Sequence, residues 1–316
     1  MIRMAMRTNI YSLPNELLIS ALSPLRTREL LPLATVSHRF HDIVFRILQG
    51  RLSRTAALPG HRLILECYHP SVAISTPWMY CDHIETDRLP SPHSSHDATS
   101  PAKGSSSSQA NGTARHEPSF ADLGRLYSHF RPVPQQEIRR ARGRTRLRVE
   151  QLVGAAPLDD DDDAVDTPSH DVHLDEDELF TQLCTIINVV RLGPGRGYFT
   201  GQSNVSDGVI RVWRNWLADA AAASAKDPGG DVSSSHRILW SDATQDVGVR
   251  FRVTEIDQPT TFVQRPVLVT ADEQETVSYR LEFQELLVRT KLLLMALEKS
   301  EDHQSTSGNA LVLFSG

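Results

Sequence analysis

Cysteine is scarce in this chain of 316 residues. The three cysteines, Cys67, Cys81 and Cys184, are odd in number and lack the close spacing of metal-binding pairs. A domain held together by disulfide bonds is therefore not expected. Reduced thiols are typical of the cytosol and the nucleus, so we expect the protein in the cytoplasm, in the nucleus or in both.

Long apolar runs and an excess of basic residues are also missing. Residues 286–297 form the most apolar late segment, but Arg289 and Lys291 make it too charged to span a bilayer. Residues 1–11 lack the apolar centre of a secretory signal peptide. The formal net charge of −6 argues weakly against nucleic acid as the main partner. We therefore expect a protein that binds neither membranes nor nucleic acid as its main activity.

Motifs of catalysis and of metal binding are absent as well. The sequence has no nucleophile elbow, no HExxH, no CxxC pair and no dinucleotide-binding glycines in the proper context. His170 and His173 lie among carboxylates, but the five aspartates of residues 159–163 repel each other and favour a solvated chain. Zinc sites usually need four preorganised ligands. We therefore expect no enzyme, no metal site and no cofactor.

Leucine, in contrast, is abundant at helical spacing in residues 12–47. Ser12 is typical of a helix start, and Pro24 ends the first apolar stripe. Further stripes between residues 26 and 47 predict two more short helices, with a break at Pro32. Three helices of about 40 residues cannot bury a full core by themselves. Some leucines therefore need a partner surface, on another protein or on the rest of the chain.

The order of these residues resembles an F-box over residues 11–52. The resemblance rests on Leu13-Pro14-x-Glu16, Leu17-Leu18, Leu22, Leu25, Leu30-Leu31, Leu33-Ala34, Val36-Ser37, Arg39-Phe40 and Ile43. The region "RILQGRL" departs from it, because many F-boxes end there with a Leu-Trp pair. The resemblance implies a helical module that docks on the small SKP-type adaptor of a cullin–RING ubiquitin ligase.

Apolar anchors at helical spacing are the residue types that such a docking surface needs. We expect the adaptor to contact Leu13, Pro14, Leu17, Leu18, Leu22, Leu33 and Val36. Phe40 and Ile43 fit internal packing equally well, and the sequence does not assign a face to each leucine.

The remainder of the chain predicts strands as well as helices. Alternating apolar residues predict strands in residues 61–69, 71–75, 78–86, 236–242, 247–256, 262–270 and 277–283. Apolar faces of helical period predict helices in residues 178–190, 206–226 and 286–297. Strands and helices do not alternate regularly. We therefore expect an α+β fold, in which a small N-terminal three-helix F-box precedes a larger domain with an antiparallel sheet, packed helices and disordered loops.

Composition divides the chain further. The expected units are a helical module at 11–55, an α+β target-binding domain at 61–300 and a C-terminal tail at 301–316. The Ser- and Pro-rich residues 88–121 and the acidic residues 157–175 predict disordered inserts. The basic residues 139–153 are consistent with a strand whose arginines face water, or with a nuclear-localisation or anion-binding patch.

Three functions are compatible with this organisation. The first is a substrate receptor of an SCF-type E3 ubiquitin ligase, which holds a protein target near the ubiquitin-loaded enzyme and forms no bond itself. The second is a scaffold that binds the adaptor outside ubiquitin transfer. The third is a ligand- or glycan-binding module that carries an F-box.

Overall fold

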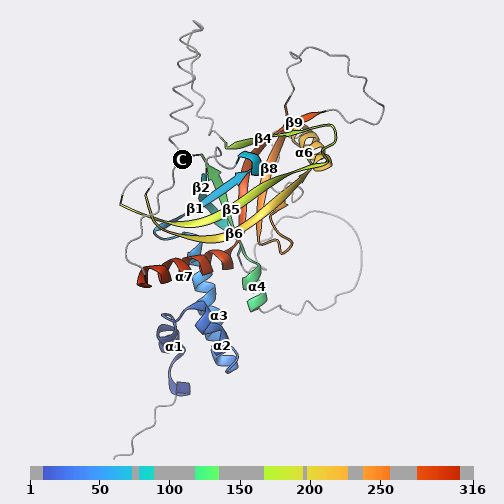
Figure 1. Cartoon of the computed structure of the whole chain (residues 1–316). Coiled ribbons are helices and arrows are strands. Elements are labelled where there is room, and N and C mark those ends of the chain that lie inside the picture. The colour runs from blue at the N-terminus through green and yellow to red at the C-terminus, as the bar shows by residue number, and fades with distance from the viewer. Residues whose placement is uncertain are drawn as a thin grey trace, which may run out of the picture.

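The computed structural model describes residues 10–72, 78–88, 118–134, 167–194, 198–226, 238–256 and 276–306. The elements in chain order are η1 Ile10–Ser12, α1 Asn15–Leu22, α2 Thr27–Leu33, α3 His38–Thr55, β1 His61–Tyr68, η2 Pro70–Val72, β2 Met79–Thr86, α4 Phe120–Arg125, β3 Tyr127–Val133, β4 Ser169–Leu174, β5 Phe180–Leu192, β6 Phe199–Trp213, α6 Arg214–Lys226, β7 Ile238–Trp240, β8 Val247–Glu255, β9 Val277–Arg289 and α7 Thr290–Thr306. Helices α1–α3 lie at one end of the molecule, and a sheet forms most of the remainder (Figure 1). The predicted α+β class is confirmed.

The sheet of the described residues has nine strands, and all its pairs are antiparallel. The strand order is β6-β5-β1-β2-β3-β9-β8-β7, and β4 pairs with the first half of β9. Alternate side chains of each strand point inward. Leu63, Phe130, Ile187 and Phe251 meet there with no exposed surface. Burying each such side chain contributes about 1.5–3 kcal/mol to stability.

Strong curvature brings the two outer strands of the sheet towards each other. A methyl group added at Gly208 in β6 would lie only 2.9 Å from the Cβ atom of Ser241, which follows β7. Glycine is needed at this position because any side chain would collide with the opposite strand end. The sheet therefore encloses its own core, and helices α6 and α7 add Leu217 and Leu293 to that core.

Helix α7 also joins the sheet to the helical module. It packs against β6 and β9 of the sheet and against α3 of the module (Figure 1). Leu294 of α7 lies in the same buried cluster as Leu18, Leu30 and Val44 of the helical module. The leucine-rich helices therefore bury one side against a helix from the far end of the chain.

The helix predicted at residues 178–190 is wrong, because these residues form most of strand β5. Helical spacing of the apolar residues was misleading, since β5 is buried on both faces along its second half. Ile187 and Val189 point into the sheet core, while Val190 packs with Ile64 and Phe199 in a separate cluster on the other face. Burial on both faces removes the alternation that identifies a strand, and the β-branched residues are the remaining signal.

The helix predicted at residues 206–226 is correct only in its second half. Residues 206–213 belong to strand β6, and helix α6 begins at Arg214. The closing helix also begins later than predicted, because β9 continues to Arg289 before α7 starts at Thr290. The predicted strands at 61–69, 78–86, 236–242, 247–256 and 277–283 correspond to β1, β2, β7, β8 and part of β9. The strand predicted at 71–75 begins in the short helix η2, and its other residues, like those of 262–270, lie outside the described residues.

Two described elements lie partly or wholly inside the predicted disordered inserts. Strand β4 occupies Ser169–Leu174, where pairing with β9 satisfies its backbone hydrogen bonds, so this part of the 157–175 insert is ordered. Helix α4 begins at Phe120, within the 88–121 insert. Residues 89–117 and 157–166, and the basic residues 139–153, lie outside the described residues.

The break predicted at Pro32 does not occur there. Helix α2 continues through Pro32 and ends one residue later, at Leu33. Helix α7 runs to Thr306, so it extends into the predicted tail at 301–316. The division at residues 55, 61 and 300 remains a prediction.

Candidate protein-docking surface

One group of exposed apolar side chains lies on the first two helices and the turns beside them. Leu17 of α1 and Val36, just before α3, are 56% and 58% exposed. Leu13 and Leu31 are also exposed, as is Pro14. Large apolar side chains left in water on several neighbouring elements are typical of a protein-interaction surface.

Arg39 connects the start of α1 to the start of α3. Its Nε atom donates a hydrogen bond of 2.8 Å to Oδ1 of Asn15, and its Nη2 atom donates to the carbonyl oxygen of Leu13. Ser37 caps α3, because its hydroxyl accepts a hydrogen bond from the backbone N–H of Phe40. These contacts bring Leu13, and the turn that carries Val36, to the same end of the helical module.

Three of the predicted contact residues face the interior instead. Leu18 is only 2% exposed and lies in the buried cluster of the helical module. Leu22 and Leu33 are partly buried and pack against the same cluster. Their role in the structure is to hold the helices together. Phe40 and Ile43 are buried as well, which matches internal packing.

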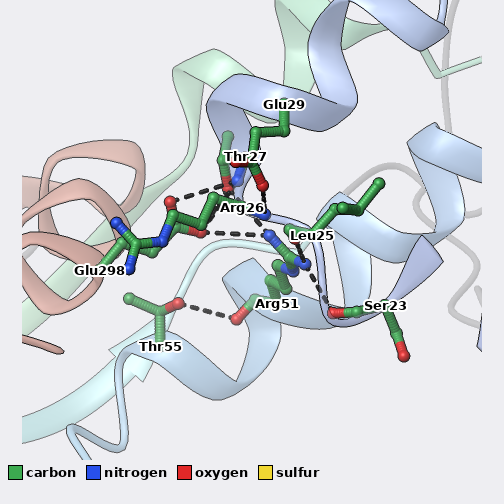
Figure 2. A network of polar contacts seen from close by, with 8 residues as sticks. All are labelled: Ser23, Leu25, Arg26, Thr27, Glu29, Arg51, Thr55 and Glu298. Atoms are coloured by element: carbon green, nitrogen blue, oxygen red, sulfur yellow. Dashed lines mark hydrogen bonds and ion pairs between the residues drawn. The ribbon is translucent and has the colours of Figure 1, made fainter. Parts of the chain in front are cut away.

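The start of α2 is held by a polar network that includes α7 (Figure 2). The carboxylate of Glu298 accepts hydrogen bonds from the backbone N–H of Thr27 at 3.2 Å and from its hydroxyl at 2.7 Å. A negative charge at a helix N-terminus is favourable, because the N–H groups of the first turn have no partner within the helix. A residue of the closing helix thus caps a helix of the N-terminal module.

Arg51 of α3 completes this network (Figure 2). Its guanidinium lies 3.1 Å from Glu298 and donates to the carbonyl oxygens of Ser23 and Leu25. Those carbonyls follow α1, so one arginine ties the end of α1 to α3 and α7. Arg26 adds a further ion pair to α7, with Asp302. The exposed leucines therefore sit on helices whose positions are fixed relative to α7 and the sheet.

Sequence reasoning missed both this network and Leu31. Leu31 belongs to the F-box-like pattern, but the face of a short helix is not readable without its neighbours. Arg51 and Glu298 are 247 residues apart in the sequence. Nothing in the local pattern around either residue points to the other.

A second charged cluster lies on the sheet. Nδ1 of His129 donates a hydrogen bond of 2.7 Å to Glu285, and Nε2 donates one of 3.2 Å to Asp87. Glu285 also pairs with Arg250 at 2.6 Å. The pKa of His129 is raised above its ordinary value of 6.5, mainly by the hydrogen bond to Glu285. Burial of the imidazole acts in the opposite direction but is the smaller effect. Both ring nitrogens act as donors, which favours the imidazolium form.

We expect stability to fall as the pH rises through the folded-state pKa of His129. The imidazolium contributes fully below the unfolded pKa of 6.5, and that contribution is lost once the folded protein releases the proton. In the window between the two pKa values the slope reaches at most about −1.4 kcal/mol per pH unit. Urea unfolding of the wild type and of His129→Gln between pH 6 and pH 9 measures this difference.

The comparison with His129→Gln controls for the second shifted histidine. Burial lowers the pKa of His170, so the contribution of His170 to stability has the opposite pH dependence. His170 is unchanged in both proteins and cancels in the comparison. Equal slopes for the two proteins would show that the interaction of His129 with Glu285 does not stabilise the folded state.

Metal and membrane sites are not apparent in the described residues. No group of three or more His, Cys, Asp or Glu side chains could hold a metal ion in that part of the chain. His173 instead contacts the hydroxyl of Ser278 at 2.8 Å. No described helix is both long enough and apolar enough to cross a bilayer.

Comparison with known proteins identifies the helical module. The family model described as F-box-like matches residues 10–53, which include α1, α2 and nearly all of α3. No curated protein and no solved structure matches the chain. F-box domains in general bind SKP-type adaptors within cullin–RING ligases, and proteins that carry them are typically non-catalytic. Residues 10–53 thus form an F-box-like domain, and the chain is an F-box domain-containing protein.

Proposed function

We propose that this protein is a substrate receptor of an SCF-type E3 ubiquitin ligase. The F-box-like domain binds the SKP-type adaptor, and the sheet domain binds a protein target. The observation that carries the proposal is the set of exposed apolar side chains, Leu13, Pro14, Leu17, Leu31 and Val36, on a domain that matches the F-box-like family. The protein works in the cytoplasm, in the nucleus or in both.

The physical basis of adaptor binding is burial of these side chains. A stable interface of standard size buries about 1,600 Å², and a few apolar anchors supply most of its free energy. Leu17 and Val36 are the strongest candidates for anchors, because they are more exposed than Leu13 and Leu31. Leu18, Leu22 and Leu33 act indirectly, since they pack the helices that present the anchors.

The rigid connection through α7 supports the rest of the proposed mechanism. A receptor accelerates ubiquitin transfer by holding its target at high effective concentration and in a fixed orientation. Leu294, Glu298 and Asp302 of α7 contact the F-box-like domain, while Leu293 and Leu297 of the same helix belong to the core of the sheet. A target bound to the sheet would therefore keep a defined position relative to the adaptor.

Replacing Leu17 and Val36 together by aspartate should weaken adaptor binding at least about 100-fold. The charges would have to be desolvated in an apolar interface, and loss of two anchors corresponds to about 2.7 kcal/mol. Calorimetry with a purified SKP-type adaptor measures the change. Both side chains are exposed, so circular dichroism should show an unchanged fold.

Leu192→Asp is the matched control, because Leu192 is an exposed leucine at the end of β5. It should bind the adaptor like the wild type. An unchanged affinity of the Leu17→Asp/Val36→Asp variant for the adaptor would show that these side chains do not form the docking surface. Adaptor binding without recruitment of a cullin, or without ubiquitin transfer in a reconstituted ligase, would favour a scaffold role.

A further inference from the structure

The outer face of β6 changes character along its length. Its outward side chains are polar from the start of the strand as far as Asp207, with Thr200, Gln202, Asn204 and Asp207 exposed. They are then Val209, Arg211 and Trp213, all exposed. A solvated sheet face normally carries polar residues throughout. The exposed Val209 and Trp213 at the end of this long strand need a separate explanation.

Strand β5 and the turn before it extend this apolar area. Phe180 is the direct cross-strand partner of Trp213, and the two rings lie 5.0 Å apart. Leu179 precedes Phe180 and is exposed as well. We define the aromatic–arginine patch as Leu179, Phe180, Val209, Arg211 and Trp213.

The aromatic–arginine patch contains one cation with an unusual setting. The guanidinium carbon of Arg211 lies 4.8 Å from the ring centre of Phe180 and 5.8 Å from that of Trp213. In the part of the chain that the structure describes, no carboxylate pairs with Arg211. Stacking on rings orients the guanidinium and leaves its N–H donors free for a bidentate acceptor.

The surroundings hold this patch rigidly. Arg214 donates a backbone hydrogen bond of 2.9 Å to the carbonyl oxygen of Leu179, and its side chain donates to the carbonyl oxygens of Asp175 and Glu178. Beneath the patch, Ile210 and Val212 are fully buried in the sheet core. A patch on paired strands with a fixed entry turn loses little entropy when it binds a partner.

The turn beside the patch carries charges of the opposite sign. Residues 175–178 are Asp, Glu, Asp and Glu, and all four are exposed. A partner that covers the patch would place its neighbouring residues near these carboxylates. This surface therefore combines exposed apolar side chains, one oriented guanidinium and an acidic edge.

We propose that the aromatic–arginine patch is the target-binding surface, and that it binds a protein segment in which an aspartate or glutamate adjoins a large apolar residue and basic residues follow. This inference rests on the proposed function. The target carboxylate pairs with Arg211, the apolar side chain packs on Phe180 and Trp213, and the basic residues face the turn at 175–178. Trp and Arg are the residues that most often dominate binding energy at protein interfaces.

Nucleic acid and phosphorylated segments fit this surface less well. A dianionic phosphate would meet a single arginine beside four carboxylates, and a polyanion would be repelled by the same edge. The single charge of a carboxylate is balanced by Arg211 alone. Basic residues beside that carboxylate would be attracted to the acidic turn at 175–178, so the turn would strengthen binding instead of weakening it.

The test is selection of 12-residue peptides from a random display library on the full-length protein. We expect enrichment of peptides with Asp or Glu next to Trp, Phe or Leu, followed by Lys or Arg. The enriched peptides should lose at least about 10-fold in affinity on Arg211→Glu, equivalent to about 1.4 kcal/mol. Peptides with Lys in place of the acidic residue should regain binding to that variant.

Arg62→Glu is the matched control, because Arg62 is also an exposed strand arginine over an aromatic ring, 4.8 Å from the centre of Tyr80. It should bind the peptides like the wild type. Adaptor binding, measured on the same samples, should be unchanged in both variants. If the wild-type protein does not bind the adaptor, the proposed function is overturned, whatever the peptide measurements show for the aromatic–arginine patch.

Three results would overturn the inference. The first is enrichment of peptides without the acidic–apolar pattern. The second is affinity that does not change on Arg211→Glu. The third is tighter binding of an enriched sequence when a phosphorylated residue replaces the acidic one.

Discussion

Replacing Arg51 by alanine should lower the free energy of unfolding by about 3 kcal/mol. Removing one partner of a buried ion pair typically costs about 3–5 kcal/mol, and both side chains here keep some contact with water, 15% for Arg51 and 21% for Glu298. The variant also leaves the carbonyl oxygens of Ser23 and Leu25 without their side-chain donor. Urea unfolding followed by circular dichroism measures the loss.

Arg46→Ala is the control for this prediction, because Arg46 is an exposed arginine on the same helix. Its effect should stay within about 0.5 kcal/mol, as for other surface substitutions. Arg51→Lys should recover only part of the loss, since an ammonium group cannot reach Glu298 and two carbonyls in the geometry of a guanidinium. A cost for Arg51→Ala no larger than that of Arg46→Ala would show that the network in Figure 2 contributes nothing to stability.

Hydrogen exchange locates the effect of the same substitution. The amides of α2 should exchange faster in Arg51→Ala, because Thr27 loses the support that Arg51 gives to Glu298. The core strands β8 and β9 should change less. Adaptor affinity should fall along with the order of α2, even though Arg51 itself is not part of the exposed apolar set.

Glu285→Ala should destabilise the sheet domain by about 3–5 kcal/mol. The substitution leaves the guanidinium of Arg250, only 13% exposed, without its counter-charge, and a buried unpaired charge is expensive. It also removes the acceptor of the Nδ1 proton of His129. Thermal and urea unfolding of the variant measure the loss.

The control for Glu285→Ala is Glu255→Ala, because Glu255 is exposed at the end of β8. It should cost no more than about 0.5 kcal/mol. The double variant Arg250→Ala/Glu285→Ala should cost less than the sum of the single variants, since neither partner is then left alone. Strict additivity would mean that the two side chains do not interact. Glu285→Ala should also flatten the pH dependence that His129 produces.

The F-box-like domain was predictable because its pattern is local. Leu13, Pro14, Leu17 and Val36 stand in the order expected of an F-box, and the helices follow the spacing of their leucines. The faces of those helices were not predictable. Leu17 is exposed and its neighbour Leu18 is buried, because α3 and α7 cover only one side of the module.

The sheet was predictable where its strands are covered on one face. Residues 249–254 of β8 alternate between buried and half-buried side chains, and the sequence shows the same alternation. Strand β5 was misread as a helix because Ile187, Val189 and Val190 are buried on two different faces. Periodicity reports burial on one side only, so it fails for a strand covered on both.

The sequence by itself determined which parts of the chain are helical at the F-box-like domain, that the remaining body is α+β, and that some leucines need a surface beyond the three short helices. Only the tertiary structure decided that Glu298 caps α2, that His129 meets Glu285, and that Arg211 lies over Phe180 and Trp213. The physical reason is range. Helix starts and apolar stripes depend on residues a few positions apart, whereas these contacts form because strand pairing and helix docking bring distant segments together.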